Sequence, residues 1–337
     1  MSSSIWLLPQ GVSEILPAEA AKLEALRRSI LDELQDQGFD LVFPPMIEFL
    51  DNLIQGAGSE LTTQTFKVPD YDSHKTLGIR ADMTPQLAQI DAHRMTTSEI
   101  NKLCYIGTVL RTQPMTLGGS RELLQIGAEL FGDESIAADK SIVDAMLAVH
   151  SLSFKNKQQL TLSLSHVDIF SALIEALEIN EQQSAQIYDA LLRKSTPDIN
   201  VLNANANEDL SVFVALSKAR GDSSIIEQIK HEPSIAKLMS DNNNVSNRID
   251  TALTELAALA EYISKSNDTE HVNLHVDLSE LHGYRYHTGL TFQTFIKDEG
   301  RAIAKGGRYH GFSESSAKPR AATGFSVDLK LLASKAA

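Results

Sequence analysis

The residues best suited to chemistry lie on one predicted strand, at positions 123–131. Successive side chains of a strand point to opposite faces, so Gln125, Gly127 and Glu129 share one face. The other face is apolar and consists of Leu124, Ile126, Ala128 and Leu130. A carboxylate and an amide on either side of a glycine could bind a small cationic ligand, with Gly127 leaving room for it. A solvent-facing strand side explains the same pattern equally well.

A second predicted strand, at 103–111, ends in Arg111. Its guanidinium could bind a carboxylate or phosphate, although an arginine at a strand end is usually just solvated. The same strand holds Cys104, the only cysteine, which cannot form an internal disulfide and is expected in the core. Three histidines lie in one region but lack acidic or cysteine partners at the spacing of metal ligands: His282, His287 and His310. We therefore expect no metal, and without a P-loop lysine motif or a GxGxxG motif we expect no cofactor.

A helix and a strand are predicted ahead of these segments. Pro17 suits the first helical turn, and Gly38 provides a stop after four residues that recur at helical spacing, namely Leu23, Leu26, Ile30 and Leu34. In the following segment, Phe39, Leu41 and Phe43 alternate with Asp40 and Val42, as in a strand. The pair Pro44 and Pro45 ends it, because proline cannot donate a hydrogen bond to a sheet.

The remaining chain predicts more strands and a long helical stretch. Further strands are predicted in three segments: 161–165, 272–278 and 291–296. Between 167 and 266 the apolar residues recur at helical spacing. The sequence therefore predicts an α+β fold with a mostly antiparallel sheet and an all-helical insertion. We expect the core in two parts, 1–165 and 267–337, with the insertion at 166–266.

Composition narrows the classes of function. With 42% apolar residues among 337, the chain can bury a real core. Its apolar runs are far shorter than the roughly 20 residues of a membrane span, and its start lacks the pattern of a signal peptide, so we expect a cytoplasmic location. The 30 lysines and arginines against 44 aspartates and glutamates give a net charge of -14, which disfavours general nucleic-acid binding.

Five segments, in order, resemble the class II aminoacyl-tRNA synthetases, and the histidyl enzyme in particular. They are LDELQDQGFDLVFPPMIEF (31–49), IRADMTPQLAQ (79–89), VLRTQPMTLGGSRELLQIGAELFG (109–132), AKGGRYHGF (304–312) and AATGFSVDLKLL (321–332). The resemblance implies a class II synthetase-like antiparallel sheet flanked by helices. It also implies that the first segment forms a dimer interface.

The resemblance further implies a histidine-binding pocket. Asp82, Thr84 and Gln125 would hold the α-amino group, and Glu129 would accept a hydrogen bond from the imidazole. Arg111 would lie near the carboxylate. Two more positions belong to this set, one lining the ring and one standing where the family has a tyrosine: Tyr286 and His287. A carboxylate acceptor favours a ring that carries an N–H donor, since an analogue without one leaves the acceptor unpaired.

Three positions depart from the synthetase pattern. His282 stands where the synthetases have an arginine that contacts the substrate, and Leu331 stands where they have the arginine that holds the γ-phosphate. Gln113 replaces a glutamate that helps to read the nucleotide. Adenylate formation needs fixed cations in its transition state, so these changes predict that synthetase activity is lost. The chain also ends soon after the last motif, where a synthetase continues into an anticodon-binding domain. We therefore expect no tRNA partner and no membrane partner.

A chain that keeps the residues for recognising histidine but loses those for forming its adenylate is suited to sensing histidine. With GYRYHTG, RADMTPQ and GGSR in place, it resembles the regulatory subunits of ATP phosphoribosyltransferase, a paralogue family of the histidyl enzyme. The resemblance implies a hetero-octamer with the short-form catalytic subunit, which it activates and through which histidine exerts feedback inhibition in histidine biosynthesis. Two alternatives are an active adenylate-forming enzyme and a stand-alone histidine-binding module.

Overall fold

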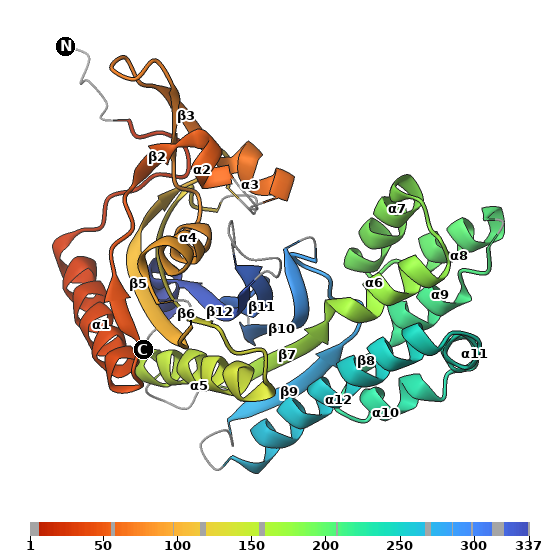
Figure 1. Cartoon of the computed structure of the whole chain (residues 1–337). Coiled ribbons are helices and arrows are strands. Elements are labelled where there is room, and N and C mark those ends of the chain that lie inside the picture. Colours follow the sequence, from red (N-terminus) through yellow and green to blue (C-terminus); the bar gives the residue numbers. More distant parts are fainter. Residues whose placement is uncertain are drawn as a thin grey trace. The chain divides into compact units, whose positions relative to one another are not determined.

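The structure, a computed structural model, describes ten stretches of the chain: 7–54, 58–96, 98–114, 119–154, 159–206, 208–266, 271–284, 286–297, 299–311 and 320–335. The chain divides into two compact units (Figure 1). The first comprises Met1–Asp133, Asp144–Asn156 and Gly311–Ala337, and the second comprises Glu134–Val143 and Lys157–His310. Helix α5 (Ile136–Ser153) contributes to both.

The first unit is built on four strands in the order β1-β5-β6-β12. Their bounds are Asp40–Val42, Asn101–Leu110, Glu122–Phe131 and Arg320–Asp328. β1 runs parallel to β5, and the other neighbours are antiparallel. The register places Tyr105 opposite Gly127 and Glu129 opposite Gly324. Both pairs belong to the candidate site.

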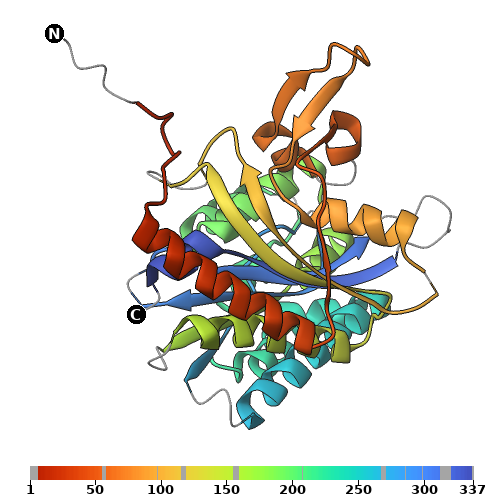
Figure 2. The same ribbon diagram turned by 90° about the vertical axis from the view of Figure 1, so that its left-hand side faces the viewer.

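Helices α1 (Pro17–Asp36), α4 (Thr84–Arg94) and α13 (Leu329–Lys335) complete this part of the unit. α1 begins at Pro17, buries Ile30 and Leu34, and is followed by Gly38 at a φ of 83°. A left-handed backbone of this kind favours glycine and ends a helix, as predicted. α1 lies alongside the strands of the unit (Figure 2) and contacts α13.

A separate three-stranded sheet, visible in orange in Figure 2, was missed by the sequence analysis. Its strands β2 (Ile47–Phe49), β3 (Phe66–Pro69) and β4 (Thr76–Ile79) lie in the order β2-β4-β3. Two short helices, α2 (Leu50–Ile54) and α3 (Gly58–Gln64), lie between β2 and β3. On one face of the sheet, Gly78 faces Leu53 of α2. Cross-strand pairs place six apolar residues on the opposite face: Ile47, Phe49, Phe66, Val68, Leu77 and Ile79.

The second unit has five strands in the order β11-β10-β7-β9-β8. They are β11 (Ala304–Gly311), β10 (His287–Ile296), β7 (Leu160–His166), β9 (Val272–Asp277) and β8 (Arg220–Gly221). β7 and β9 are parallel, and the other neighbouring pairs are antiparallel. The described pairs therefore give the mostly antiparallel arrangement that the sequence predicted.

Within the described residues of the predicted helical stretch, the second unit forms seven helices. They are α6 (Val167–Ala176), α7 (Glu181–Leu192), α8 (Thr196–Asn205), α9 (Ser211–Lys218), α10 (Ile225–Lys230), α11 (Pro233–Asp241) and α12 (Asn243–Lys265). The same stretch also contains the two-residue strand β8, which pairs with β9. The helices form one compact unit with β7 and β9–β11, so a separate insertion at 166–266 stays a prediction.

The core is as apolar as the composition suggested. Cys104 is fully buried, and burial raises the pKa of its thiol to about 11. The structural interpretation of this cysteine is therefore confirmed, since a thiol that stays protonated is a poor nucleophile.

Candidate functional site

Four of the predicted site residues come together in the first unit. The side chain of Gln125 on β6 bonds the loop between β4 and α4: its Oε1 accepts from the N–H of Met83 at 3.0 Å, and its Nε2 donates to Asp82 Oδ1 at 3.1 Å. The same Asp82 oxygen accepts from the N–H of Thr84 at 2.9 Å. The Gln125 amide thus holds the loop in place and leaves the second oxygen of Asp82 for another donor.

The carboxylate of Glu129 is the buried end of this cluster. Glu129 is 1% exposed and Gln125 is 4% exposed, so the alternative of a solvent-facing strand side was wrong. Thr84 Oγ1 donates to Glu129 Oε1 at 3.0 Å and lies 3.3 Å from the hydroxyl of Tyr105. Because a hydroxyl has one proton, Tyr105 is the donor toward Thr84. The result is a hydrogen-bonded chain from Tyr105 through Thr84 to Glu129.

Two glycines make room for this chain. A Cβ on Gly324 would lie 1.6 Å from Glu129 Oε2, so the carboxylate occupies the space that a side chain would fill. A Cβ on Gly127 would lie 2.5 Å from the hydroxyl of Tyr105 and 2.3 Å from the carbonyl oxygen of Phe325. The prediction that Gly127 leaves room for a ligand was therefore wrong, because Tyr105 and the neighbouring strand fill that space.

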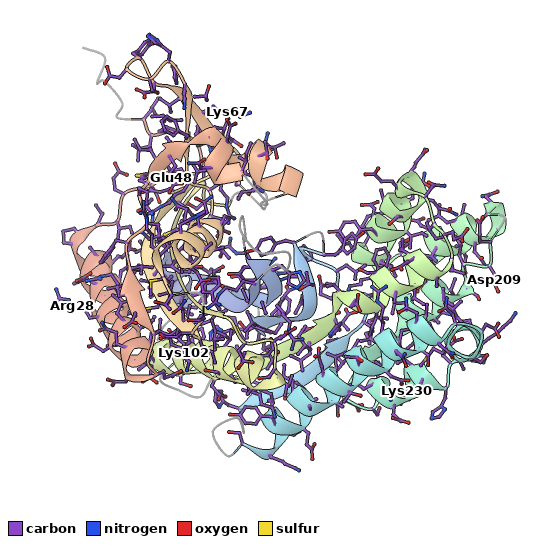
Figure 3. All side chains as sticks on the ribbon, viewed as in Figure 1. Arg28, Glu48, Lys67, Lys102, Asp209 and Lys230 are labelled. Atoms are coloured by element: carbon purple, nitrogen blue, oxygen red, sulfur yellow. The ribbon has the colours of Figure 1, made fainter. Side chains whose placement is uncertain are left out.

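The loop that carries Asp82 and leads into α4 at Thr84 is anchored on both sides by residues that were not predicted from the sequence. Arg80 Nε donates to the carbonyl of Thr108 at 2.9 Å, and its Nη1 donates to the carbonyl of Pro44 at 2.7 Å. Gln86 Nε2 donates to Glu48 Oε1 at 2.7 Å (Glu48 is labelled in Figure 3). Burial lowers the pKa of Arg80. The available signal was an arginine flanked by apolar residues at the end of a strand.

Arg111 follows β5 directly, as predicted for a strand end. Its Nε donates to the carbonyl of Ala81 at 3.3 Å, which brings it to the same loop. Arg121 Nε donates to the carbonyl of Arg111 at 3.1 Å, and its guanidinium lies over the ring of Phe66 at 5.2 Å. Arg111 therefore joins the four residues above within the first unit.

Two residues that bind the nucleotide in the synthetase pattern are replaced in the first unit. Gln113 is exposed, and Leu331 lies on α13. The neighbouring Lys330 cannot stand in for an arginine, because its ammonium contacts the carboxylate of Glu122 at 3.3 Å and donates to the Glu122 carbonyl. A leucine has no group that binds phosphate.

Tyr286 and His287 belong to the second unit. The ring of Tyr286 stacks on that of Tyr309 with centroids 4.8 Å apart. The His287 ring lies against Gly283 and Gly307, and its Nδ1 donates to the carbonyl of Arg308 at 3.3 Å. Burial lowers the pKa of His287 to about 4, so the ring is neutral at pH 7 with its proton on Nδ1. Their role toward histidine stays a prediction.

A metal site or a membrane-spanning helix would indicate a further kind of function. Within the described stretches, no three His, Cys, Asp or Glu side chains are grouped as metal ligands would be. No helix in the described part of the chain has the length and apolar character needed to cross a membrane.

Comparisons with known proteins identify the fold and the family of the chain. Residues 11–332 match the family model of histidyl-tRNA synthetase. The structure of an ATP phosphoribosyltransferase regulatory subunit/histidyl-tRNA synthetase from Bacillus halodurans C has a TM-score of 0.82 at 24% identity, over 100% of this chain and 84% of that one. A chain of the ATP phosphoribosyl transferase (HisG:HisZ) complex from Thermotoga maritima has a TM-score of 0.66 at 16% identity, over 90% of this chain and 96% of that one. The fold is therefore that of the class II synthetases, of the histidyl type.

The sequence identity to curated relatives assigns the chain to one family within this class. The ATP phosphoribosyltransferase regulatory subunit of Thioalkalivibrio sulfidiphilus is 40% identical over 334 residues, which cover 98% of this chain and 81% of the relative. The chain belongs to the family of ATP phosphoribosyltransferase regulatory subunits. It is thus a member of a regulatory family rather than an active synthetase.

Proposed function

We propose that the chain binds free histidine in the first unit, activates the short-form catalytic subunit of ATP phosphoribosyltransferase and transmits feedback inhibition by histidine. Asp82 would accept from the α-amino group, Arg111 would lie near the carboxylate, and Glu129 would accept from the imidazole. The partner is inferred from the names of the relatives, and the proposed assembly is a hetero-octamer.

One observation carries the proposal. The side chains of Asp82, Thr84, Gln125 and Glu129 are held together by hydrogen bonds, which supports their proposed role as acceptors. By contrast, Leu331 stands where the synthetase pattern has the arginine that holds the γ-phosphate. Glu129 is buried over Gly324, and a carboxyl group is costly to bury in a core, which supports a role in binding. Recognition without activation is the chemistry of a sensor.

The direct test mixes the purified chain with the short-form catalytic subunit and measures the transferase rate as histidine is titrated. We expect the rate to rise when the chain is added and to fall again with histidine. An unchanged rate at saturating chain would contradict the activating role. If calorimetry still detected histidine binding in that case, the chain would be a stand-alone histidine-binding module.

We also propose that the chain self-associates as a dimer through the apolar face of the three-stranded sheet. On this face Ile47 is 52% exposed, Phe49 is 39% exposed and Val68 is 41% exposed. The preceding segment adds Phe43, which is 73% exposed. A contiguous apolar face of this kind is typical of an interface, and the segment resembles the one that pairs across a two-fold axis in the synthetases.

Replacing Ile47 by aspartate should convert the dimer into a monomer, because two copies of a buried charge would face each other across a two-fold axis. Light scattering at micromolar concentration measures the change. The matched control is Val201→Asp, at an apolar residue of α8 that is 60% exposed, which should stay dimeric. A wild-type chain that is monomeric at this concentration would refute the proposed dimer.

A further inference from the structure

Helix α7 ends in a backbone conformation that normally selects glycine, yet the residue there is a lysine. Lys194 has a φ of 55°. Its N–H donates to the carbonyl of Leu191 at 2.9 Å, and the N–H of Ser195 donates to the carbonyl of Ala190 at 2.9 Å. This pair of bonds is the Schellman motif, in which the left-handed position is usually glycine. The backbone alone gives no reason for a lysine, so the reason lies in its side chain.

The ammonium of Lys194 contacts three polar groups at the start of the loop after β9. Nζ lies 2.8 Å from Asp277 Oδ2, 3.1 Å from Ser279 Oγ and 3.5 Å from Glu280 Oε2. The side chain of Lys194 is 24% exposed, that of Asp277 is 10% exposed and that of Glu280 is 17% exposed. Partly buried ion pairs are screened less by water and salt than surface pairs.

The two carboxylates that contact Lys194 also shape the loop at 277–284. Asp277 Oδ1 accepts from both the N–H and the hydroxyl of Ser279. Glu280 Oε1 accepts from the N–H of His282 and pairs with its Nδ1 at 2.6 Å. Burial raises the pKa of Glu280, but the bond from His282 and the charge of Lys194 lower it more, to about 2. The Glu280 carboxylate thus remains ionised at neutral pH, and both carboxylates are held in place by these hydrogen bonds.

Apolar contacts tie the same loop to the helices of the second unit. The ring of Tyr284 meets Phe170 of α6 edge-on with centroids 5.0 Å apart, and meets Tyr188 of α7 at 5.3 Å. The N–H of Leu278 donates to the carbonyl of Ala219 at 3.0 Å. The loop leads to Tyr286, whose N–H donates to the carbonyl of Gly283 at 2.7 Å. Movement of α7 would therefore pull on the loop at 277–284.

We propose that Lys194 is a positioning residue whose ammonium fixes the loop at 277–284, so that the packing of α7 sets how firmly this loop is held within the second unit. The proposal rests on the contacts above and is tested without any ligand.

The test separates the lysine side chain from its backbone conformation. Lys194→Gly relieves the left-handed backbone but removes the ammonium, whereas Lys194→Met keeps the backbone conformation and the apolar stem. The matched control is Glu178→Gly at the end of α6, where Glu178 has a φ of 50° and an exposed side chain. There too a Schellman pair forms, from Glu178 to Glu175 and from Ile179 to Ile174. Within the described stretches, the Glu178 carboxylate has no ion pair that its loss would break.

We expect amide hydrogen exchange in the loop at 277–284 to accelerate by roughly three- to tenfold in both Lys194 variants, and not in Glu178→Gly. Unchanged loop exchange in Lys194→Gly and Lys194→Met overturns the proposal, as does an equal acceleration in Glu178→Gly.

Discussion

Replacing Glu129 by alanine should weaken histidine binding by about 1 to 3 kcal/mol, or roughly five- to 150-fold in Kd. The substitution removes the buried carboxylate that we propose as the acceptor for the imidazole N–H, and it also leaves the hydroxyl of Thr84 without the carboxylate oxygen that it bonds at 3.0 Å. Titration calorimetry with the isolated chain measures the affinity. Glu129→Gln fills the same space over Gly324 but offers a neutral acceptor, so its loss should be smaller.

The same variant tests the link to regulation in the mixed complex. Glu129 lies in the buried cluster and not on the exposed apolar face, so Glu129→Ala should still stimulate the catalytic subunit. Inhibition by histidine should be lost, because a ligand regulates only through its differential binding to two states. Glu208→Ala removes an exposed carboxylate and serves as the control of equal charge. Equal inhibition midpoints for wild type and Glu129→Ala would show that histidine acts elsewhere.

Replacing Gly127 by alanine should destabilise the first unit by about 3 kcal/mol, the upper part of the range for overpacking a core. The new Cβ would lie 2.3 Å from the carbonyl oxygen of Phe325, which belongs to the neighbouring strand and cannot move aside without breaking the ladder. It would also lie 2.5 Å from the hydroxyl of Tyr105. Denaturant unfolding followed by circular dichroism measures the loss.

The control for this substitution is Gly300→Ala. A Cβ on Gly300 meets no atom within 4 Å, so its effect should stay within roughly 0.5 kcal/mol of zero. A further variant, Gly127→Ala with Tyr105→Phe, removes only the hydroxyl contact and should recover little stability, because the backbone contact remains. Equal stability of Gly127→Ala and wild type would show that the strands can separate at this point, and would contradict the packing described for the cluster.

The local elements were predictable because their signals are local. α1 could be placed from Pro17, its apolar spacing and Gly38, since a helix start, a helix face and a left-handed stop each depend on a few neighbouring residues. Strands β5 and β6 could be placed because each is a ten-residue segment, and in β6 apolar and other residues alternate. The three-stranded sheet could not, because its strands are only three or four residues long and its apolar face is exposed in the single chain.

The pairing of Gln125 with Glu129 could be predicted without a structure, because the period of a strand puts both side chains on one face whatever surrounds them. The burial of that face and its contacts depend on segments that are distant in the sequence. Tyr105 fills the space over Gly127 from a strand that pairs with β6 at a register no local pattern reveals. Lys194 meets Asp277, far along the chain, and such a contact is stable only after the intervening segments have packed.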